Sequence, residues 1–186
     1  MEPWKPNGPE RGFVARLDAL VERGDRGSLA ALRRGLAEES GSLEALLVLG
    51  RVLPADLSER DEETHGLVAA LFAATQRGNR DRSTTEGDLG ASLARLLAKR
   101  SEASVRPRVL ALLATRREDL VPPLRRAVTI LDSDGIGIDW AQLLHDLLAW
   151  DHPDRVVQRR WTRSYRRALA PDPADVPATS PETGVA

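Results

Sequence analysis

The chain has 186 residues, of which 41% are hydrophobic and 30% charged, and its formal net charge is −1. This length and apolar content suffice to bury a hydrophobic core in one domain or in two small lobes. The absence of cysteine excludes disulfides, thiolate zinc sites and a cysteine nucleophile. The first residues lack the basic and apolar regions of a signal peptide, and no later apolar run is long enough to span a membrane. We therefore expect a soluble, cytoplasmic protein that has no membrane partner.

The charges nearly cancel in total but are segregated along the chain. Residues 95–126 hold nine Lys or Arg against three acids, and residues 155–167 hold six Arg and no acid. Residues 127–154, between these segments, contain six Asp and no base, and an acidic run lies at 56–63. Opposite patches suit a protein that holds a polyanion on one side and protein neighbours on another. Only arginine position is informative here, because a GC-rich genome would also replace lysine by arginine throughout.

The hydrophobic pattern predicts an all-helical protein. Apolar residues recur every three or four positions, and no segment alternates with a period of two. The first helix should begin near Pro9 and end at Gly24, and a second follows it at once. A third helix is predicted from about Ser42 to Leu53, and a fourth begins after Ser58, where an acidic first turn suits a helix N-terminus.

The middle of the chain contains two interruptions. Gln76 to Gly87 has no apolar residue, which predicts a mobile loop. Thr85 and Asp88 then resemble a capping pair for the next helix. Ser101 to Pro107 predicts a second break before another helix, and a further helix should begin at about Asp119, with its two prolines in the first turn.

The C-terminal part should contain two more helices. Asp139 and Gln142 form a capping pair for an apolar helix, and Pro153 is predicted to start the last one. The tail has too little apolar surface to fold by itself. We expect an all-α helical bundle of about eight helices in two loosely divided lobes, residues 9–100 and 101–170, with a disordered tail at 171–186.

The last helix should separate its side chains by face. At about 100° per residue, one side carries Arg155, Arg159, Arg163 and Arg166, and the opposite side carries Val157, Trp161, Tyr165 and Ala168. The apolar side is expected to pack. The other side presents guanidinium groups, whose planar fork binds phosphate bidentately.

No group of residues indicates a catalytic or metal site. The segment Asp132 to Gly137 looks like the start of a calcium loop, but Leu143 stands where a carboxylate is needed. His65, His145 and His152 are spaced too widely to share a helical face, so we expect isolated histidines and a surface position for His145. We therefore expect a protein that is not an enzyme and that has no cofactor and no metal.

The candidate nucleic-acid-binding residues are arginines, most of them in adjacent pairs. For any single pair, interaction with a helix dipole explains the position equally well. Collectively they would form a groove that follows phosphates, and the tryptophans sit at core spacings, so backbone contact without sequence reading is the natural inference. The candidates are Arg33, Arg34, Arg80, Arg82, Arg106, Arg108, Arg116, Arg117, Arg125 and Arg126.

Three segments, in this order, resemble a known family. They are G-D-R-G-S-L-A-A-L-R-R-G at Gly24 to Gly35, the stretch Val121 to Arg126, and I-D-W-A-Q-L-L-H-D-L-L-A-W followed by V-Q-R-R-W at Ile138 to Trp161. The set resembles CasB, the small subunit of the type I-E CRISPR surveillance complex Cascade. Each motif is weak alone, but the ordered set is fairly specific.

The resemblance implies an all-helical, non-catalytic protein that forms a dimer in a guide-RNA complex, beside backbone and large subunits. Such subunits help to hold the guide-paired target strand and the displaced DNA strand through basic surface residues. The matching positions here are Arg33, Arg34, Arg125 and Arg126. The other six candidates are an extension from charge and location.

The leading hypothesis is a subunit for antiviral defence that stabilises the R-loop through arginines without reading sequence. Opening the duplex is nearly balanced against forming the heteroduplex, so a few contacts decide whether the open state persists. Two alternatives remain. One is a pure scaffold whose arginines meet carboxylates of neighbouring subunits. The other is a helix-turn-helix-like regulator, disfavoured because no short helix pair carries a clear recognition face.

Overall fold

The computed structural model describes residues 8–35, 42–76, 87–167 and 169. These residues form nine α-helices and two short 3₁₀ helices and contain no β-strand, which confirms the predicted all-α fold. The loop and the tail predicted at residues 77–86 and 171–186 lie outside the described residues. The helices are α1 (Pro9–Glu22), α2 (Arg26–Gly35), α3 (Leu43–Val52), α4 (Glu59–Thr75), α5 (Leu89–Arg95), η1 (Leu96–Ala98), α6 (Glu102–Ala114), η2 (Arg117–Asp119), α7 (Val121–Ser133), α8 (Trp140–Leu148) and α9 (Val156–Arg167).

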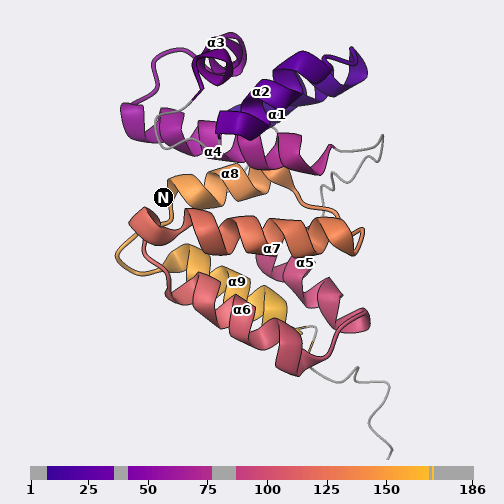
Figure 1. Ribbon diagram of the computed structural model, residues 1–186. Coiled ribbons are helices and arrows are strands. Elements are labelled where there is room, and N and C mark those ends of the chain that lie inside the picture. Colours follow the sequence, from indigo (N-terminus) through magenta and orange to yellow (C-terminus); the bar gives the residue numbers. More distant parts are fainter. Residues whose placement is uncertain (1–7, 36–41, 77–86, 168, 170–186) are drawn as a thin grey trace, which may run out of the picture.

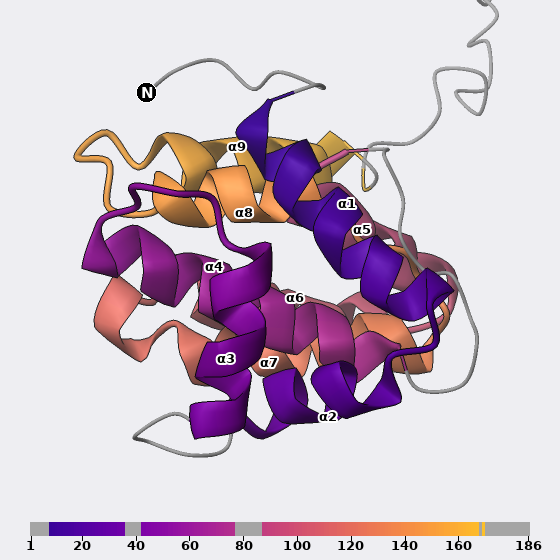
Figure 2. The ribbon, with the colours of Figure 1, turned by 90° about the horizontal axis from the view of Figure 1, so that it is seen from above.

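The helices are stacked along one direction of the molecule. In Figure 1, α1, α2 and α3 lie at one end, α4, α8 and α7 follow, and α5, α6 and α9 lie at the other end. Figure 2 shows the first end from above, with α3 at the rim beside α2. Helices α4 and α8 therefore join the two ends, because α4 packs on α2, α7 and α8, and α8 also packs on α1.

A single hydrophobic cluster runs through the whole stack. Helix α1 contributes a buried stripe that begins at Phe13, and α4 contributes Phe72, whose ring meets the Trp140 ring of α8 edge-on at 5.7 Å between centroids. Trp161 of α9 lies against Trp150 at 5.1 Å. The division into lobes at residues 9–100 and 101–170 stays a prediction; in the structure α5 packs against α9, on the far side of that division.

The contact between α5 and α9 depends on a glycine. A Cβ atom on Gly90 would lie 2.3 Å from the backbone oxygen of Trp161 and 2.6 Å from its Cα atom. No side chain fits at such distances, so the two helix backbones approach each other only because this position is glycine.

The break predicted at Ser101 to Pro107 was wrong, because α6 begins at Glu102 and contains Pro107 in its interior. Proline removes one helical hydrogen bond and crowds the preceding turn. Here the buried stripe Val105, Val109 and Leu112, at helical spacing, packs against α7 and keeps the helix continuous. Tertiary packing thus outweighs the local preference of one residue.

Two helix starts also differ from the prediction. The last helix begins at Val156, not at Pro153, because Arg155 has a φ of 50°, a left-handed conformation that an α-helix cannot include. Helix α5 is capped by Asp88 itself, whose carboxylate accepts a 3.0 Å hydrogen bond from the Ala91 amide. Thr85, the partner predicted for Asp88, lies outside the described residues. The cap predicted at Asp139 is confirmed, since its carboxylate accepts from the Gln142 amide at 3.0 Å.

Candidate nucleic-acid interface

Helix α9 has the two faces that the sequence predicts. Val157, Trp161 and Tyr165, spaced by four residues, are at most 5% exposed. The exposed side carries a row of arginines: Arg159, Arg163 and Arg166. Among the described residues, none of the three has a carboxylate within ion-pair distance. Arg155, at the start of this row, donates instead to the Leu113 backbone oxygen and so ties the beginning of α9 to α6.

A surface groove of about 780 Å³ lies between α6 and α9. Leu110, Leu113 and Val156 form its apolar part, and Arg155, Arg159 and Arg163 line it from α9. Such a groove places guanidinium groups beside an apolar surface. There the electrostatic attraction between a guanidinium and a phosphate is stronger than in open solvent, because fewer water molecules surround the pair. None of these three arginines belongs to the candidate set, although the sequence placed all three on the cationic face of the last helix.

Arg106 extends the basic surface beyond this groove. Burial raises the pKa of the Tyr165 hydroxyl, nearby Glu102 raises it further, and Arg106 opposes this shift, so Arg106 lies close to α9. Its ion pair with Glu102 is long, at 3.8 Å, and both side chains are exposed. Exposed pairs of this kind contribute about 0–1 kcal/mol. Arg106 can therefore leave the Glu102 carboxylate and bind a phosphate with little loss of free energy.

The packed helices α6 and α7 and the turn between them carry four more candidates. Arg125 and Arg126 are exposed in the first half of α7 and have no carboxylate partner among the described residues. Arg116 is 84% exposed and lies 3.9 Å from Glu118, again a loose surface pair. Arg108 is exposed but folds back onto the Ser104 backbone oxygen. Arg106 and Arg108, two residues apart on α6, do not share a face of that helix, so the single basic surface formed by all the candidates stays a prediction.

Two candidates are engaged inside the protein. Arg117 donates to the Leu147 backbone oxygen at 2.8 Å and to the Thr64 hydroxyl, and burial lowers the pKa of its guanidinium. Arg33 donates to the Ala73 backbone oxygen at 3.2 Å. Both side chains satisfy carbonyls at ends of neighbouring helices, so their first role is to hold α2, α4 and α8 in place.

The remaining candidates do not join the main basic surface. Arg34 is half exposed, lies 3.5 Å from Glu44, and sits on α2 at the opposite end of the stack from α6 and α9 (Figure 1). Arg80 and Arg82 lie outside the described residues. Arg106, Arg108, Arg116, Arg125 and Arg126 thus belong to α6, α7 and the turn between them, whereas Arg33 and Arg34 belong to α2 at the opposite end of the stack (Figure 1).

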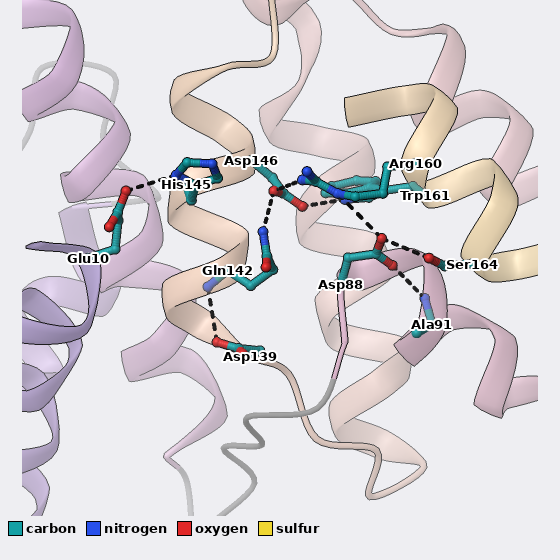
Figure 3. A network of polar contacts seen from close by, with 10 residues as sticks. All are labelled: Glu10, Asp88, Ala91, Asp139, Gln142, His145, Asp146, Arg160, Trp161 and Ser164. Carbon is teal, nitrogen blue, oxygen red and sulfur yellow. Dashed lines mark hydrogen bonds and ion pairs between the residues drawn. The ribbon is translucent and has the colours of Figure 1, made fainter. Parts of the chain in front are cut away.

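A buried polar network that the sequence did not predict holds α9 in place. Asp146 of α8 is fully buried and accepts from Gln142 Nε2 at 2.7 Å and from Trp161 Nε1 at 2.5 Å, and it pairs with Arg160 (Figure 3). Burial raises the pKa of the Asp146 carboxyl, and these three partners offset the shift only in part. Arg160 also faces Asp88 at 3.6 Å, so this arginine of α9 is directed inward.

Two of the three histidines are buried, and the surface position predicted for His145 is wrong. His65 is 4% exposed, meets the Phe13 ring edge-on at 4.8 Å, and donates from Nδ1 to the Asp61 backbone oxygen at 2.6 Å. Burial lowers the pKa of this imidazole. His145 is 9% exposed and lies 3.0 Å from the Glu10 carboxylate of α1 (Figure 3). Both rings join helices, because α1 packs against α4 and α8 at these points.

Within the described residues, no cluster of His, Asp and Glu has the geometry to hold a metal ion. No helix there is both long and apolar enough to cross a bilayer. The features present define a class: an all-helical protein with a basic surface on α6, α7 and α9.

The comparisons name the family. The chain belongs to the CRISPR-associated protein Cse2 family, whose model matches residues 28–165. It is 39% identical over 152 residues to the CRISPR-associated protein Cse2 of Thermus thermophilus, covering 76% of this chain and 79% of that protein. These matches confirm the family predicted from the sequence motifs.

Solved structures of related proteins have a similar fold. CasB from Thermus thermophilus has a TM-score of 0.72 and 35% identity, covering 86% of this chain and 99% of that one. A chain of a CRISPR RNA-guided surveillance complex has a TM-score of 0.66 and 29% identity, covering 84% of this chain and 95% of that one.

Proposed function

We propose that this chain is the non-catalytic small subunit of a type I-E CRISPR RNA-guided surveillance complex in the cytoplasm. In this proposal it stabilises the R-loop by sequence-independent contacts between its arginines and both the target and the displaced DNA strand. It acts as a homodimer within the complex, beside the guide RNA, the backbone subunits and the large subunit. Family membership and the relatives solved in surveillance complexes support this assignment.

One observation carries the proposal: exposed guanidinium groups without carboxylate partners, among the described residues, lie on α7 and α9, away from the α1–α3 end of the stack (Figure 1). Arg125 and Arg126 project from α7, and Arg159, Arg163 and Arg166 project from α9. A surface evolved only for solubility mixes both signs of charge. Cations on rigid helices are positioned before a strand arrives, so little ordering is needed on binding.

The energetics suit a holding role. The heteroduplex is about as stable as the duplex that it replaces, so the open state is decided by small terms. Each phosphate contact releases condensed counterions, and this gain does not depend on base sequence. Several such contacts on an unpaired strand are enough to slow re-annealing, while base pairing with the guide supplies the specificity.

The double variant R125E/R126E separates strand binding from the scaffold alternative. The complex is reconstituted with guide RNA, and both the incorporation of this subunit and the lifetime of the R-loop are measured. We expect normal incorporation and a shortened lifetime. Loss of incorporation with an unchanged lifetime in the remaining complex would instead support the scaffold.

The matched control is R23E/R26E, which makes the same charge change at exposed positions at the other end of the stack. This control should leave the R-loop lifetime unchanged. An equal effect of both double variants would indicate a response to net charge and would refute a localised strand contact.

A further inference from the structure

The end of the molecule opposite the α6–α9 groove carries an exposed apolar stripe on α3 (Figure 1). Leu43, Leu46 and Leu47 are 73%, 56% and 65% exposed. Their spacing of three and four residues places them on one side of the helix. The opposite side of α3 already faces the core through Ala45, Val48 and Val52. Among the described residues, the three leucines, here called the α3 leucine face, therefore have no packing role.

Such a face indicates a binding surface. Single exposed apolar residues are normal on a soluble protein, but a contiguous group on one regular element marks a contact site. Helix α3 is also held rigidly, because Arg16 of α1 donates from Nε to the Val52 backbone oxygen at 2.6 Å at its C-terminal end. A rigid helix that offers leucines at this spacing matches helix–helix recognition.

The charges near this face identify the kind of partner. Asp56, Glu59 and Glu62 follow α3 in the loop and first turn of α4; all are exposed, and they form no ion pair with the described residues. Glu44 is also exposed on α3 itself; it accepts a 2.7 Å hydrogen bond from the Ser42 hydroxyl and lies 3.5 Å from Arg34. Unpaired carboxylates repel phosphate, so this end does not suit nucleic acid. They attract a protein surface that carries Lys or Arg.

We propose that the α3 leucine face docks a helix of a different protein subunit of the surveillance complex, and that this helix presents apolar side chains flanked by basic ones. The inference rests on the proposed function for membership of the complex and for the assignment of the α6–α9 groove to DNA. It assigns the two ends of the stack to different partners, with protein at α3 and DNA at α6, α7 and α9.

A second copy of this chain fits the face less well. If two α3 helices paired antiparallel about a two-fold axis, Glu44 of one copy would approach Asp56, in the loop that follows the other α3, and like charges would meet. Arg51 does not relieve this, because its guanidinium points to the Ser28 hydroxyl at 3.2 Å. The chain's own base-flanked apolar surface is the α6–α9 groove, which the proposed function gives to DNA.

The absence of cysteine from this chain permits a direct test. The variant L47C is labelled with a maleimide photocrosslinker, assembled with guide RNA and the other subunits, irradiated and digested, and the adducts are identified by mass spectrometry. We expect adducts on one other subunit, in a helix rich in apolar and basic residues. An adduct on a second copy of this chain, on nucleic acid, or on nothing in an assembled complex would overturn the proposal. The variant A103C, exposed on α6 at the other end, serves as the control and should give different adducts.

Charge introduction gives a second readout. The variant L46E/L47E changes exposed side chains, so its thermal midpoint should stay within a few degrees of wild type. Its incorporation should fall on the order of tenfold or more, since burying a charge at a contact centre removes that much affinity. Incorporation equal to wild type would overturn the inference. If the proposed function itself failed, the wild-type chain would not be incorporated at all, which distinguishes the two failures.

Discussion

Replacing Asp146 by alanine should strongly destabilise this protein. The carboxylate is fully buried and receives hydrogen bonds from Gln142 and Trp161 as well as the ion pair with Arg160. D146A leaves a partly buried guanidinium and two donors without their acceptor. Removing one member of a buried pair costs about 3–5 kcal/mol. Because Arg160 retains 29% side-chain exposure and can recover some hydration, we expect the lower end, about 3 kcal/mol.

Urea unfolding followed by circular dichroism measures this directly. For a chain of this size, about 3 kcal/mol corresponds to a fall in Tm of roughly 6–12 °C. D146N keeps an acceptor oxygen but loses the charge, and it should lie between wild type and D146A. In D146A/R160A the two losses should be less than additive, because both remove the same pair. A D146A protein within about 1 kcal/mol of wild type would refute the view that this network holds α9 on α8.

Two further predictions concern other buried positions. G90A should destabilise the protein by about 1–3 kcal/mol or more, because the new Cβ atom meets the Trp161 backbone. In the control G50A the new Cβ atom enters open space on a helix, so this variant should be neutral or more stable by up to about 1 kcal/mol. Equal urea midpoints for the two variants would contradict the close approach of α5 and α9. Burial lowers the pKa of His65 in the folded state, so its contribution to stability is complete above the unfolded pKa of about 6.5 and is lost as pH falls toward the lowered folded value. H65L should therefore reduce the slope of unfolding free energy against pH below about 6.5, by up to about 1.4 kcal/mol per pH unit, and an unchanged slope would show that this imidazole does not take up a proton on unfolding.

The features that the sequence predicts well depend on local periodicity and capping. The two faces of α9 follow from residues four apart, such as Trp161 and Tyr165, and the cap at Asp139 follows from its own neighbours. These signals act within one or two turns of helix. They are independent of the rest of the chain, and so the two faces of α9 and the cap of α8 followed from them.

The features that were missed depend on distant contacts. Pro107 is a local helix breaker, yet packing against α7 keeps α6 intact. Asp146 finds Arg160 and Trp161 fourteen and fifteen residues away, and only its i, i+4 contact with Gln142 gave a local signal. His65 shows no surface or core preference by itself. Its burial follows from the docking of α1.

The candidate site was predicted only in part, because the grouping of its residues also depends on distant contacts. Sequence position grouped the arginines by pairs, but the fold groups them by end of the stack. Arg117 was predicted to bind nucleic acid, and the fold places it beside backbone oxygens of α4 and α8. The arginines of α9, described from the sequence as one cationic face but left off the candidate set, line the groove with the apolar residues of α6. Only the packing of α6 on α9 creates that groove.

The most direct test of strand binding by these arginines is the salt dependence of affinity for unpaired DNA. Binding is measured by fluorescence anisotropy over a range of salt concentrations, with two unrelated sequences. We predict a linear fall of log K against log salt with a slope of about −0.7 for each phosphate neutralised, equal affinity for both sequences, and a slope that is shallower by about 1.4 in R125E/R126E. An affinity that does not change with ionic strength, or that depends on base sequence, would contradict a grip on the phosphate backbone by positioned arginines.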